Sequence, residues 1–329
     1  MNKNIAVVGA TGLVGRTMLK VLEERNFPID NLYLFASANS AGKTVRFMGK
    51  DYDVQELTEK NVNACKAEIA LFSAGSDVSK RFAPIFAKNG CVVIDNSSQW
   101  RMDNSVPLVV PEVNPQAAFK NNGIIANPNC STIQAVVALK PLHDKYKIKR
   151  IVYSTYQAVS GAGKMGLLDL ENGENGVPPK KFPHPIAHNI LPHIDVFTDD
   201  GYTKEELKMI NETRKILGDD TLRITATTAR VPVFYGHSES INIEFYSPVT
   251  REDALDTLRQ ANGVIVCDDP QNNVYPMPID VEGRNEVFVG RVRQDMSVES
   301  GLNIWVVADN IRKGAATNAV QIAELLLGK

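Results

Sequence analysis

The 329-residue chain lacks the features that mark several specialised classes of protein. It has no apolar run of about 18 residues, so we expect no membrane-spanning helix and no membrane partner. A net charge of −2 argues against nucleic acid as the main partner. The four cysteines form no CxxC pair, which argues against a zinc site and a disulfide framework. No signal peptide precedes the first apolar run, so we expect a reducing, cytoplasmic location.

A glycine-rich turn follows the first predicted strand, residues 4–9. Gly9, Gly12 and Gly15 have GxxGxxG spacing, and a helix is predicted after them through about Glu24. A strand, a tight turn and a helix N-terminus together form the context in which a dinucleotide pyrophosphate binds. An ordinary tight strand-to-helix turn is the alternative interpretation.

The second predicted strand, residues 32–35, ends without the carboxylate that usually holds the ribose 2′-OH of NAD. Hydroxyl groups, an amide and a lysine follow it instead, at Ser37, Asn39, Ser40 and Lys43. Such a loop can accept a 2′-phosphate, which favours NADP. A polar surface loop with no role in binding is the alternative.

One cysteine lies where a strand turns into a helix. Residues 123–126 form an apolar run, and residues 133–139 have helical apolar spacing. Cys130 is therefore expected at the start of the helix, with Ser131 and Thr132 as cap groups. The positive end of the helix dipole favours a thiolate there, which suits a nucleophile. A small buried hydrophobic residue is the alternative role for this cysteine.

The order of the predicted elements divides the chain in two. Strands alternate with helices in the first part, which predicts an α/β fold with a Rossmann-type dinucleotide-binding domain over residues 1–128. Longer strands around a helix at 203–217 predict an α+β catalytic and dimerisation domain, with a largely antiparallel sheet, over residues 129–308. A helix over residues 309–329 is expected to pack back on the first domain. Helices on one side of the second sheet leave a face exposed, which predicts at least a dimer.

Five segments together make the chain resemble the aspartate-semialdehyde dehydrogenase family over essentially its whole length. They are Asn127-Pro-Asn-Cys-Ser-Thr132, Tyr156-Gln-Ala-Val-Ser-Gly-Ala-Gly163, Glu212-Thr-Arg-Lys215, Arg230 with His237 seven residues later, and Asp309-Asn-Ile-Arg-Lys-Gly-Ala-Ala316. Each motif alone is weak, but the set is specific. The resemblance implies NADP-dependent reduction of β-aspartyl phosphate to aspartate semialdehyde and inorganic phosphate. This reaction would serve the biosynthesis of lysine, threonine, methionine and diaminopimelate.

The resemblance also implies roles for single residues. Cys130 is similar to the nucleophile that forms a thioester, His237 to the general acid/base and Gln157 to the residue that orients the substrate. Arg230 would pair with the substrate α-carboxylate and Glu212 would face its ammonium group. The implied substrate-binding and phosphate-binding residues are Arg101, Asn129, Glu212, Lys215 and Arg230. The implied NADP contacts are Gly9, Thr11, Gly12, Leu13, Val14, Ser37, Asn39, Ser40, Ser160, Gly161 and Asn310.

One departure from the family pattern affects the cofactor. The family often has arginine where this chain has Asn39, so we expect the preference for NADP over NAD to be modest. The implied partners are a small-molecule substrate, inorganic phosphate and a second copy of the chain in a homodimer, with a homotetramer as a further option. No metal is implied, because His184, His188 and His193 have irregular spacing and no nearby acid or thiolate cluster.

Several alternatives stay open at this point. An N-acetylglutamyl-phosphate reductase has a similar fold and Cys turn, but its cysteine usually follows glycine rather than Asn129. A catalytically silent relative that binds a nucleotide or a partner is a second alternative, against which the complete set of site residues argues. For single residues the alternatives are an exposed ion pair between Glu212 and Lys215, a loop histidine at His237, a strand-end cap at Gln157 and a solvated loop residue at Arg101.

Overall fold

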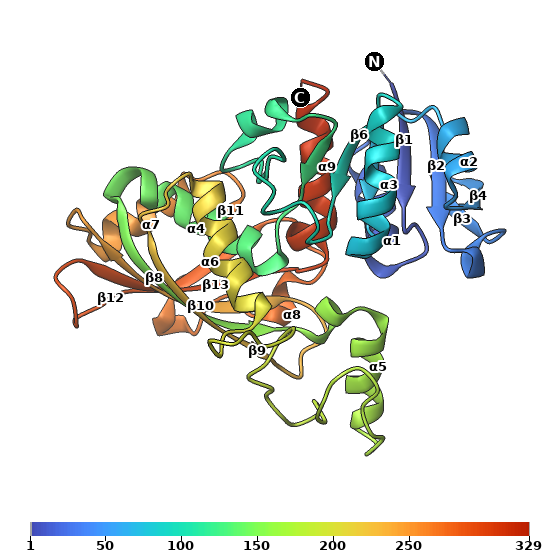
Figure 1. Cartoon of the computed structure of the whole chain (residues 1–329). Coiled ribbons are helices and arrows are strands. Elements are labelled where there is room, and N and C mark those ends of the chain that lie inside the picture. Colours follow the sequence, from blue (N-terminus) through green and yellow to red (C-terminus); the bar gives the residue numbers. More distant parts are fainter. Residues whose placement is uncertain (1, 329) are drawn as a thin grey trace. The chain divides into compact units, whose positions relative to one another are not determined.

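The computed structural model describes residues 2–328, which form two compact units (Figure 1). Unit 1 contains the chain up to Pro128 together with the C-terminal segment from Ala315 onward. Unit 2 is Asn129–Gly314. The chain therefore leaves unit 1 immediately before Cys130 and returns to it immediately after Gly314.

Within the described residues, unit 1 is built on a seven-stranded sheet of order β3-β4-β2-β1-β5-β6-β7. All neighbouring strands are parallel except β3 and β4. The strands are β1 (Lys3–Val8), β2 (Ile29–Ala36), β3 (Thr44–Phe47), β4 (Lys50–Glu56), β5 (Ile69–Phe72), β6 (Val92–Asp95) and β7 (Ile124–Ala126). The helices are α1 (Leu13–Glu24), α2 (Glu59–Ala64), α3 (Ser76–Lys88) and α9 (Thr317–Leu325), with 3₁₀ turns at Ala38–Ser40 and Pro115–Lys120.

Alternation along β1 divides the core of unit 1 into two layers. Successive side chains of a strand point to opposite faces of the sheet. Ile5 and Val7 pack in one cluster with residues of α1 and α9, and Ala6 and Val8 pack in another with residues of α3. Helices therefore cover both faces of a mostly parallel sheet, which confirms the predicted Rossmann-type fold.

The C-terminal segment differs in detail from the prediction of one helix starting at Asp309. A π-helical turn, Arg312–Ala316, comes first, and α9 begins at Thr317. Ala319, Ile322 and Ala323 of the predicted apolar stripe are fully buried in the core of unit 1. The segment up to Gly314 belongs to unit 2, where the Asp309 carboxylate accepts hydrogen bonds from the N–H groups of Ile311, Arg312 and Gly283.

Within the described residues, unit 2 is built on a six-stranded mixed sheet of order β11-β12-β13-β10-β8-β9. The three central pairs are antiparallel and the two outer pairs are parallel, so the sheet is largely antiparallel as predicted. The strands are β8 (Ile148–Gln157), β9 (Arg223–Arg230), β10 (His237–Phe245), β11 (Val264–Val266), β12 (Val287–Gln294) and β13 (Gly301–Ala308). The helices are α4 (Cys130–Tyr146), α5 (Lys164–Gly173), α6 (Lys204–Leu217), α7 (Arg251–Arg259) and α8 (Pro278–Val281), with 3₁₀ turns at Val159–Ala162 and Pro270–Asn272.

The two faces of this sheet differ. Helices α4, α6 and α7 contact the sheet, and α4 also contacts α6 and α7 (Figure 1). Alternate residues of β8 and β10 are buried. On the opposite face of β8 and β10, the intervening residues Ser154, Tyr156, Ser240 and Asn242 remain partly accessible to solvent. A sheet face of this kind, polar and aromatic in character, remains available to a partner.

Helix α4 starts at Cys130, as the apolar pattern predicted, but its cap is a different residue. The Asn129 side-chain oxygen accepts hydrogen bonds from the N–H groups of Ser131 (3.0 Å) and Thr132 (3.3 Å). The predicted cap groups, the hydroxyls of Ser131 and Thr132, do not cap the helix. The correction follows from spacing, because an N-cap side chain reaches the N–H groups two and three residues after itself, and Asn129 is the residue so placed.

Candidate active site

Cys130 is held between a helix start and a glycine of the π-helical turn. The cysteine is half-buried, whereas its neighbours Asn129 and Ser131 are buried. A side-chain carbon built on Gly314 would lie 2.9 Å from the Cβ of Cys130 and 3.3 Å from its Cα. Gly314 therefore lets the returning chain pass directly against the cysteine, and any larger residue would displace it. A π-helical turn at a reactive residue is a common functional feature.

Two buried carboxylates hold the residue before the cysteine. The backbone N–H of Asn129 donates to Oε2 of Glu212 (2.7 Å), and its side-chain N–H₂ donates to Oε1 of Glu205 (2.8 Å). Glu212 is 1% exposed, so the interpretation of an exposed Glu212–Lys215 ion pair is wrong. Lys215 lies half-buried on the same helix, α6. The position of the Cys130 turn is thus set by acids that lie far away in the sequence.

Gln157 lies at the end of β8 with its amide orientation determined by two neighbours. Its Oε1 accepts from the Thr155 hydroxyl (3.0 Å), and its Nε2 donates to Oε1 of Glu205 (3.1 Å). The residue is 1% exposed. Glu205 therefore links Asn129, beside the thiol, to the side chain predicted to orient the substrate.

Glu205 was not identified by the sequence reasoning. It forms an ion pair with Lys208 (3.0 Å), which also pairs with Asp195 (2.8 Å). Burial opposes ionisation of the carboxyl, but Lys208 and the amides of Asn129 and Gln157 outweigh it and hold the pKa of Glu205 at about 2. The carboxylate is therefore charged at neutral pH.

The sequence contained only a weak signal for Glu205. Thr203 and Glu206 form a capping box at the start of α6, with reciprocal side-chain bonds to each other's N–H groups. Since Glu206 serves as the N3 residue of that box, the adjacent Glu205 points to a different side of the helix. The spacing of Glu205 and Lys208 on a helix is compatible with an ordinary surface ion pair. Only the packing in the folded protein distinguishes this buried pair from an exposed one.

Arg230, at the end of β9, is buried but keeps most of its donors available. It is 6% exposed, and its Nη1 donates to the carbonyl of Ala158 (2.8 Å). Burial lowers the pKa of Arg230, whereas the charges of Glu205 and Cys130 raise it. The negative charge of a Cys130 thiolate thus has the Arg230 guanidinium as an electrostatic partner. A planar guanidinium with free donors is suited to bind a carboxylate.

His237 begins β10 and is completely buried. Its Nδ1 accepts a hydrogen bond from the N–H of Ala158 (2.9 Å), and its Nε2 has no hydrogen-bond partner. Burial, and then the positive charge of Arg230, lower the pKa of His237 to about 3. The alternative of an ordinary loop histidine is wrong, because the ring is enclosed and its nearest charged neighbours are site residues.

Gly161 lies over both basic residues. A side-chain carbon built on it would lie 3.0 Å from Nη1 of Arg230 and 3.3 Å from Nε2 of His237. Next to it, the Ser160 hydroxyl and the Asn310 amide hydrogen-bond each other (3.0 Å), and Asn310 also accepts from the N–H of Gly236 (3.0 Å). The structure therefore places Gly161 against the His237 ring, and bonds Ser160 to Asn310 and Asn310 to Gly236, the residue before His237, in unit 2.

The glycine turn of unit 1 fits a dinucleotide. Gly9 has φ of +83°, and a side-chain carbon on Gly15 would lie 2.2 Å from the Gly9 carbonyl oxygen. Gly12 is the N-cap of α1, and no side chain caps that helix. Its first N–H groups are therefore not occupied by a side-chain acceptor and can bind a pyrophosphate. Thr11, Leu13 and Val14 lie in or directly after the turn.

The loop after β2 forms one 3₁₀ turn. Ser37 is its N-cap residue, and Ser37 and Asn39 are both exposed. A pocket of about 390 Å³ lies nearby in unit 1 and is lined by residues of the glycine turn, α1 and β3, with four cations and one acid. Its charged residues are Arg16, Lys20, Glu23, Lys43 and Arg46. Thr11 also lines this pocket, so the cations lie beside the predicted nucleotide turn.

Arg101 lies at the carboxyl end of the unit 1 sheet. It is 8% exposed, and its guanidinium donates to the backbone carbonyls of Asn96 (2.7 Å) and Asn127 (3.0 Å). The interpretation of a solvated loop residue is therefore wrong. Asn127 lies three residues before Cys130, so Arg101 braces the strand end that leads to the cysteine.

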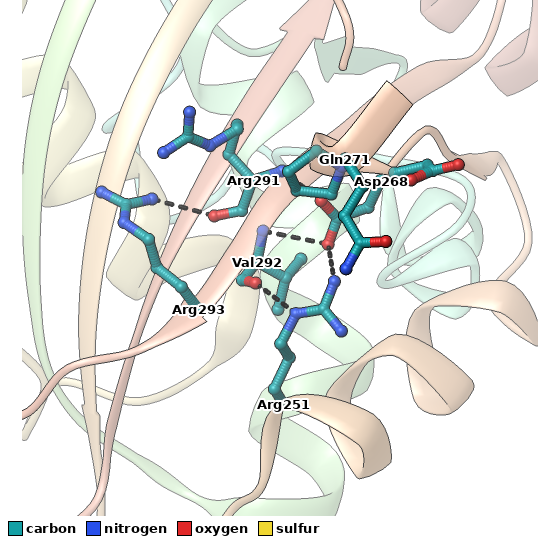
Figure 2. Close-up of a pocket in the computed structure, with 8 residues that line it drawn as sticks. Arg251, Asp268, Gln271, Arg291, Val292 and Arg293 are labelled. Carbon is teal, nitrogen blue, oxygen red and sulfur yellow. Dashed lines mark hydrogen bonds and ion pairs between the residues drawn. The ribbon is translucent and has the colours of Figure 1, made fainter. Parts of the chain in front are cut away.

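A larger pocket, of about 590 Å³, lies elsewhere in unit 2 and does not contain these residues (Figure 2). Asp268 accepts there from Arg251 (3.0 Å) and from the backbone N–H groups of Arg291 and Val292. Arg251 also donates to the Val292 carbonyl (2.8 Å), so α7 is tied to a bulge in β12. These hydrogen bonds satisfy the buried polar groups of the pocket, and their role is to support the bulge in β12.

Two of the three histidines in the Pro-rich loop make local contacts. His188 lies 3.2 Å from the Glu174 carboxylate, and the ring of His193 stacks on Phe197 at 4.3 Å. Over residues 2–328, no three His, Cys, Asp or Glu side chains lie together as metal ligands would. Across the same residues no helix is long and apolar enough to span a membrane.

Comparison with known families agrees with this fold. Residues 4–121 match the family model of the semialdehyde dehydrogenase NAD binding domain, and residues 139–313 match that of the semialdehyde dehydrogenase dimerisation domain. The two domains define a class of protein: a two-domain dehydrogenase of semialdehydes that uses a nicotinamide cofactor.

Individual relatives narrow the class. The chain is 62% identical to the aspartate-semialdehyde dehydrogenase of Aquifex aeolicus, over 99% of this chain and 98% of that protein. The crystal structure of aspartate semialdehyde dehydrogenase II from Vibrio cholerae has a TM-score of 0.96 and 51% identity, and the match covers 100% of this chain and 99% of that one. A structure of the Candida albicans enzyme with NADP has a TM-score of 0.79 and 28% identity, with 99% of each chain covered. This chain belongs to the aspartate-semialdehyde dehydrogenase family, whose members are oxidoreductases of aspartate-family amino-acid biosynthesis.

Proposed function

We propose that the protein reduces β-aspartyl phosphate to aspartate semialdehyde and inorganic phosphate, reversibly, through a thioester on Cys130, with NADP as its cofactor. The observation that carries this proposal is the convergence in unit 2 of a cysteine at a helix start, Gln157, Arg230 and His237 on one buried carboxylate network. The similar Vibrio cholerae enzyme, 51% identical, has a structure described as complexed with ASA.

The residues of this chain suit the chemistry. The Cys130 thiolate attacks the acyl carbon of the substrate, the C–O bond to phosphate breaks, and a thioester forms. Cysteine serves both as nucleophile and as leaving group, which the later release of the aldehyde requires. When bound, the nicotinamide cofactor supplies the hydride that reduces the acyl group. The guanidinium of Arg230 and the dipole of α4 favour the thiolate form of Cys130.

The hydrogen bonds made by α6 support a different proposal for one substrate contact. We propose Glu205, rather than Glu212, as the partner of the substrate ammonium group. Glu205 bonds to Gln157 and its charge acts on both Arg230 and His237, whereas Glu212 is engaged by the backbone of Asn129. Arg230 would then bind the α-carboxylate in a fork. Arg101 and a lysine of α6 would supply positive charge for the phosphoryl group. That lysine is either Lys208, which pairs with Glu205, or Lys215.

The NADP preference rests on the loop after β2 and on the neighbouring cationic pocket. No carboxylate ends β2, and Arg16 and Lys43 can offset the arginine that is absent at Asn39. Ser37→Asp should place a carboxylate where the 2′-phosphate would lie and reverse the preference. Comparing kcat/KM for NADP and NAD in both proteins tests this. A Ser37→Asp enzyme that still favours NADP would show that this loop does not contact the ribose.

We further propose a homodimer formed through the accessible face of the unit 2 sheet. Tyr156 is 36% exposed there and its ring lies 5.5 Å from that of Trp305. Aromatic residues on an accessible sheet face are typical of interfaces. In keeping with the biosynthetic role we propose a cytoplasmic location, for which the four free cysteines are suited.

One assay tests the reaction itself. Protein is mixed with aspartate semialdehyde, phosphate and NADP, and NADPH is followed by absorbance. We expect reduction of NADP that requires phosphate strictly. N-Acetylglutamate semialdehyde serves as the control substrate, because it lacks the free ammonium group that Glu205 would bind. Equal turnover of the two aldehydes, or turnover without phosphate, would contradict the proposed function.

A further inference from the structure

We propose that Phe182 is a positioning residue for substrate binding: it holds the Arg230 guanidinium in the orientation that receives the substrate α-carboxylate, and Asp169 holds Phe182 in turn. This role rests on the proposed function, in which Arg230 binds that carboxylate. Both positioning residues belong to one segment of unit 2. Asp169 lies on α5, and Phe182 lies in the Pro-rich loop after it, residues 177–193.

The Arg230 guanidinium lies over the ring of Phe182. The guanidinium carbon is 5.8 Å from the ring centroid, within the distance at which a cation is attracted to the negative face of an aromatic ring. Nη1 of Arg230 also donates to the Ala158 carbonyl (2.8 Å), and the residue is buried. Two separate contacts therefore restrain the guanidinium, and its other N–H groups remain for a carboxylate.

The same loop also binds the backbone of Arg230. The N–H of Arg230 donates to the Leu191 carbonyl (2.8 Å), and the N–H of Leu191 donates to the Arg230 carbonyl (3.0 Å). The loop thus contacts this arginine twice, at the backbone through Leu191 and at the side chain through Phe182. An arginine held at both places has few rotamers left to it.

The carboxylate of Asp169 fixes the place of Phe182. Its Oδ1 accepts from the N–H of Lys180 (2.8 Å), and its Oδ2 accepts from the N–H groups of Lys181 (2.7 Å) and Phe182 (2.9 Å). Successive N–H groups of a loop form a concave site for an anion, and here a buried side chain of α5 fills it. Burial opposes ionisation of Asp169, but these N–H groups outweigh it and lower its pKa, so the carboxylate is charged at neutral pH.

A small apolar cluster holds α5 and the loop together. Figure 1 shows α5 set apart from α4, α6 and α7, the helices that pack on the sheet of unit 2. A side-chain carbon built on Gly166 would lie 3.3 Å from Cζ of Phe182, so this glycine lets α5 approach the ring. We therefore expect changes in this segment to act on Arg230 rather than on the sheet. The cluster consists of Val159, Leu170, Ile186 and Leu191, with Leu167, Phe182 and Ala187 packed against it.

An arginine that is ordered before the substrate arrives should bind it more tightly. A long arginine side chain has many rotamers, and fixing it costs free energy that substrate binding must otherwise provide. The contacts of the loop fix the Arg230 side chain in the free protein. Loss of this order corresponds to a rise of about 5–30-fold in KM.

Two variants test the positioning role by kinetics. Phe182→Leu keeps an apolar side chain in the cluster and removes the ring, whereas Asp169→Asn keeps the shape and turns a donor toward the loop N–H groups. For each we expect KM for aspartate semialdehyde to rise about 5–30-fold. We expect kcat to stay within about threefold of wild type, because the lost binding is shared by the ground and transition states. The double variant should rise no further than the larger single change, since both act through one contact.

Phe197→Leu and Glu171→Gln are the matched controls. Phe197 is an exposed aromatic residue that stacks on His193, and Glu171 is an exposed acid of α5. Both controls should keep the wild-type KM. Unfolding of part of the protein lowers kcat and leaves KM unchanged. An unchanged KM in Phe182→Leu and Asp169→Asn, or an equal rise in the controls, would therefore overturn the positioning role.

NMR of Arg230 tests the contact without turnover. The full chain is labelled with ¹⁵N-arginine, and the Nε–H signal of Arg230 is identified by its absence from Arg230→Lys. The ring current of Phe182 shifts this signal, so Phe182→Leu and Asp169→Asn should both move it and the two controls should not. A signal that neither variant moves overturns the proposal. Wild-type protein without phosphate-dependent turnover would instead contradict the proposed function, and the signal would still decide whether Phe182 and Asp169 hold Arg230.

Discussion

Glu205→Gln should affect both stability and substrate binding, because one buried carboxylate serves three neighbours. The pKa of Glu205 is about 2 in the folded protein, against an ordinary value of 4.5. At 1.36 kcal/mol per pH unit, the charged form contributes about 3 kcal/mol to the free energy of unfolding at neutral pH. Glutamine cannot supply this stabilisation, because its N–H₂ group is a donor and would face the donor groups of Asn129, Gln157 or Lys208.

The sign of the pH dependence provides a second measurement. The folded pKa of Glu205 is depressed, so its contribution is present above pH 4.5 and is lost as the pH falls toward 2. Wild-type protein should therefore lose about 3 kcal/mol over this window through Glu205, and Glu205→Gln should not. At neutral pH the variant should unfold at a lower denaturant midpoint with an unchanged slope, and its Tm should fall by about 6–12 °C.

The catalytic consequence should appear mainly in KM for aspartate semialdehyde. Without Glu205 the amides of Gln157 and Asn129 lose their common acceptor, and the proposed partner of the substrate ammonium is removed. Glu171→Gln on α5 is the matched control, because that side chain is exposed and has no hydrogen bond in the described structure. A Glu205→Gln protein that unfolds within about 0.5 kcal/mol of wild type at pH 7 and keeps the wild-type KM would refute this reasoning.

Three further substitutions have distinct expected outcomes. Cys130→Ser should abolish turnover and leave cofactor binding intact. Iodoacetamide should label Cys130 before the other three cysteines, since burial raises the pKa of each of those thiols. Peptide mapping that finds another cysteine labelled first would contradict this prediction. Arg230→Lys should raise KM for the substrate by loss of the guanidinium fork, and an unchanged KM would remove Arg230 from the substrate site. Glu239 is fully buried without a hydrogen-bond partner, and burial raises its pKa well above 4.5. The folded state therefore keeps a proton that the unfolded chain loses above pH 4.5, so Glu239→Gln should gain stability relative to wild type as the pH rises. Urea unfolding at pH 5 and pH 8 would measure this. A difference in unfolding free energy between the two proteins that stays constant with pH would count against a neutral Glu239.

Much of unit 1 could be predicted because its signals are local. The glycine turn needs only three residues at fixed spacing, and a buried parallel strand appears as a continuous apolar run. Hairpin β3–β4 was not predicted, because its strands are short, mostly exposed and rich in charge, and thus carry no apolar pattern. Unit 2 was predicted in class but not in its last three strands. One of them, β13, does carry a strand signal, because Leu302, Ile304, Val306 and Ala308 are apolar in alternation and fully buried.

The site divides in the same way. From the sequence alone it followed that Cys130 starts a helix, that the strand before it is buried, and that no carboxylate ends β2, since each depends on residues within a few positions of one another. Only the tertiary structure selected Glu205 over Glu212 as the acid beside Gln157, chose Asn129 as the cap of α4, and placed the N–H of Ala158 on the His237 ring. The bonds from Glu205 to Asn129 and from Ala158 to His237 join residues 76 and 79 positions apart. Contacts at such separations depend on how helices pack on a sheet, and no local spacing along the chain encodes them.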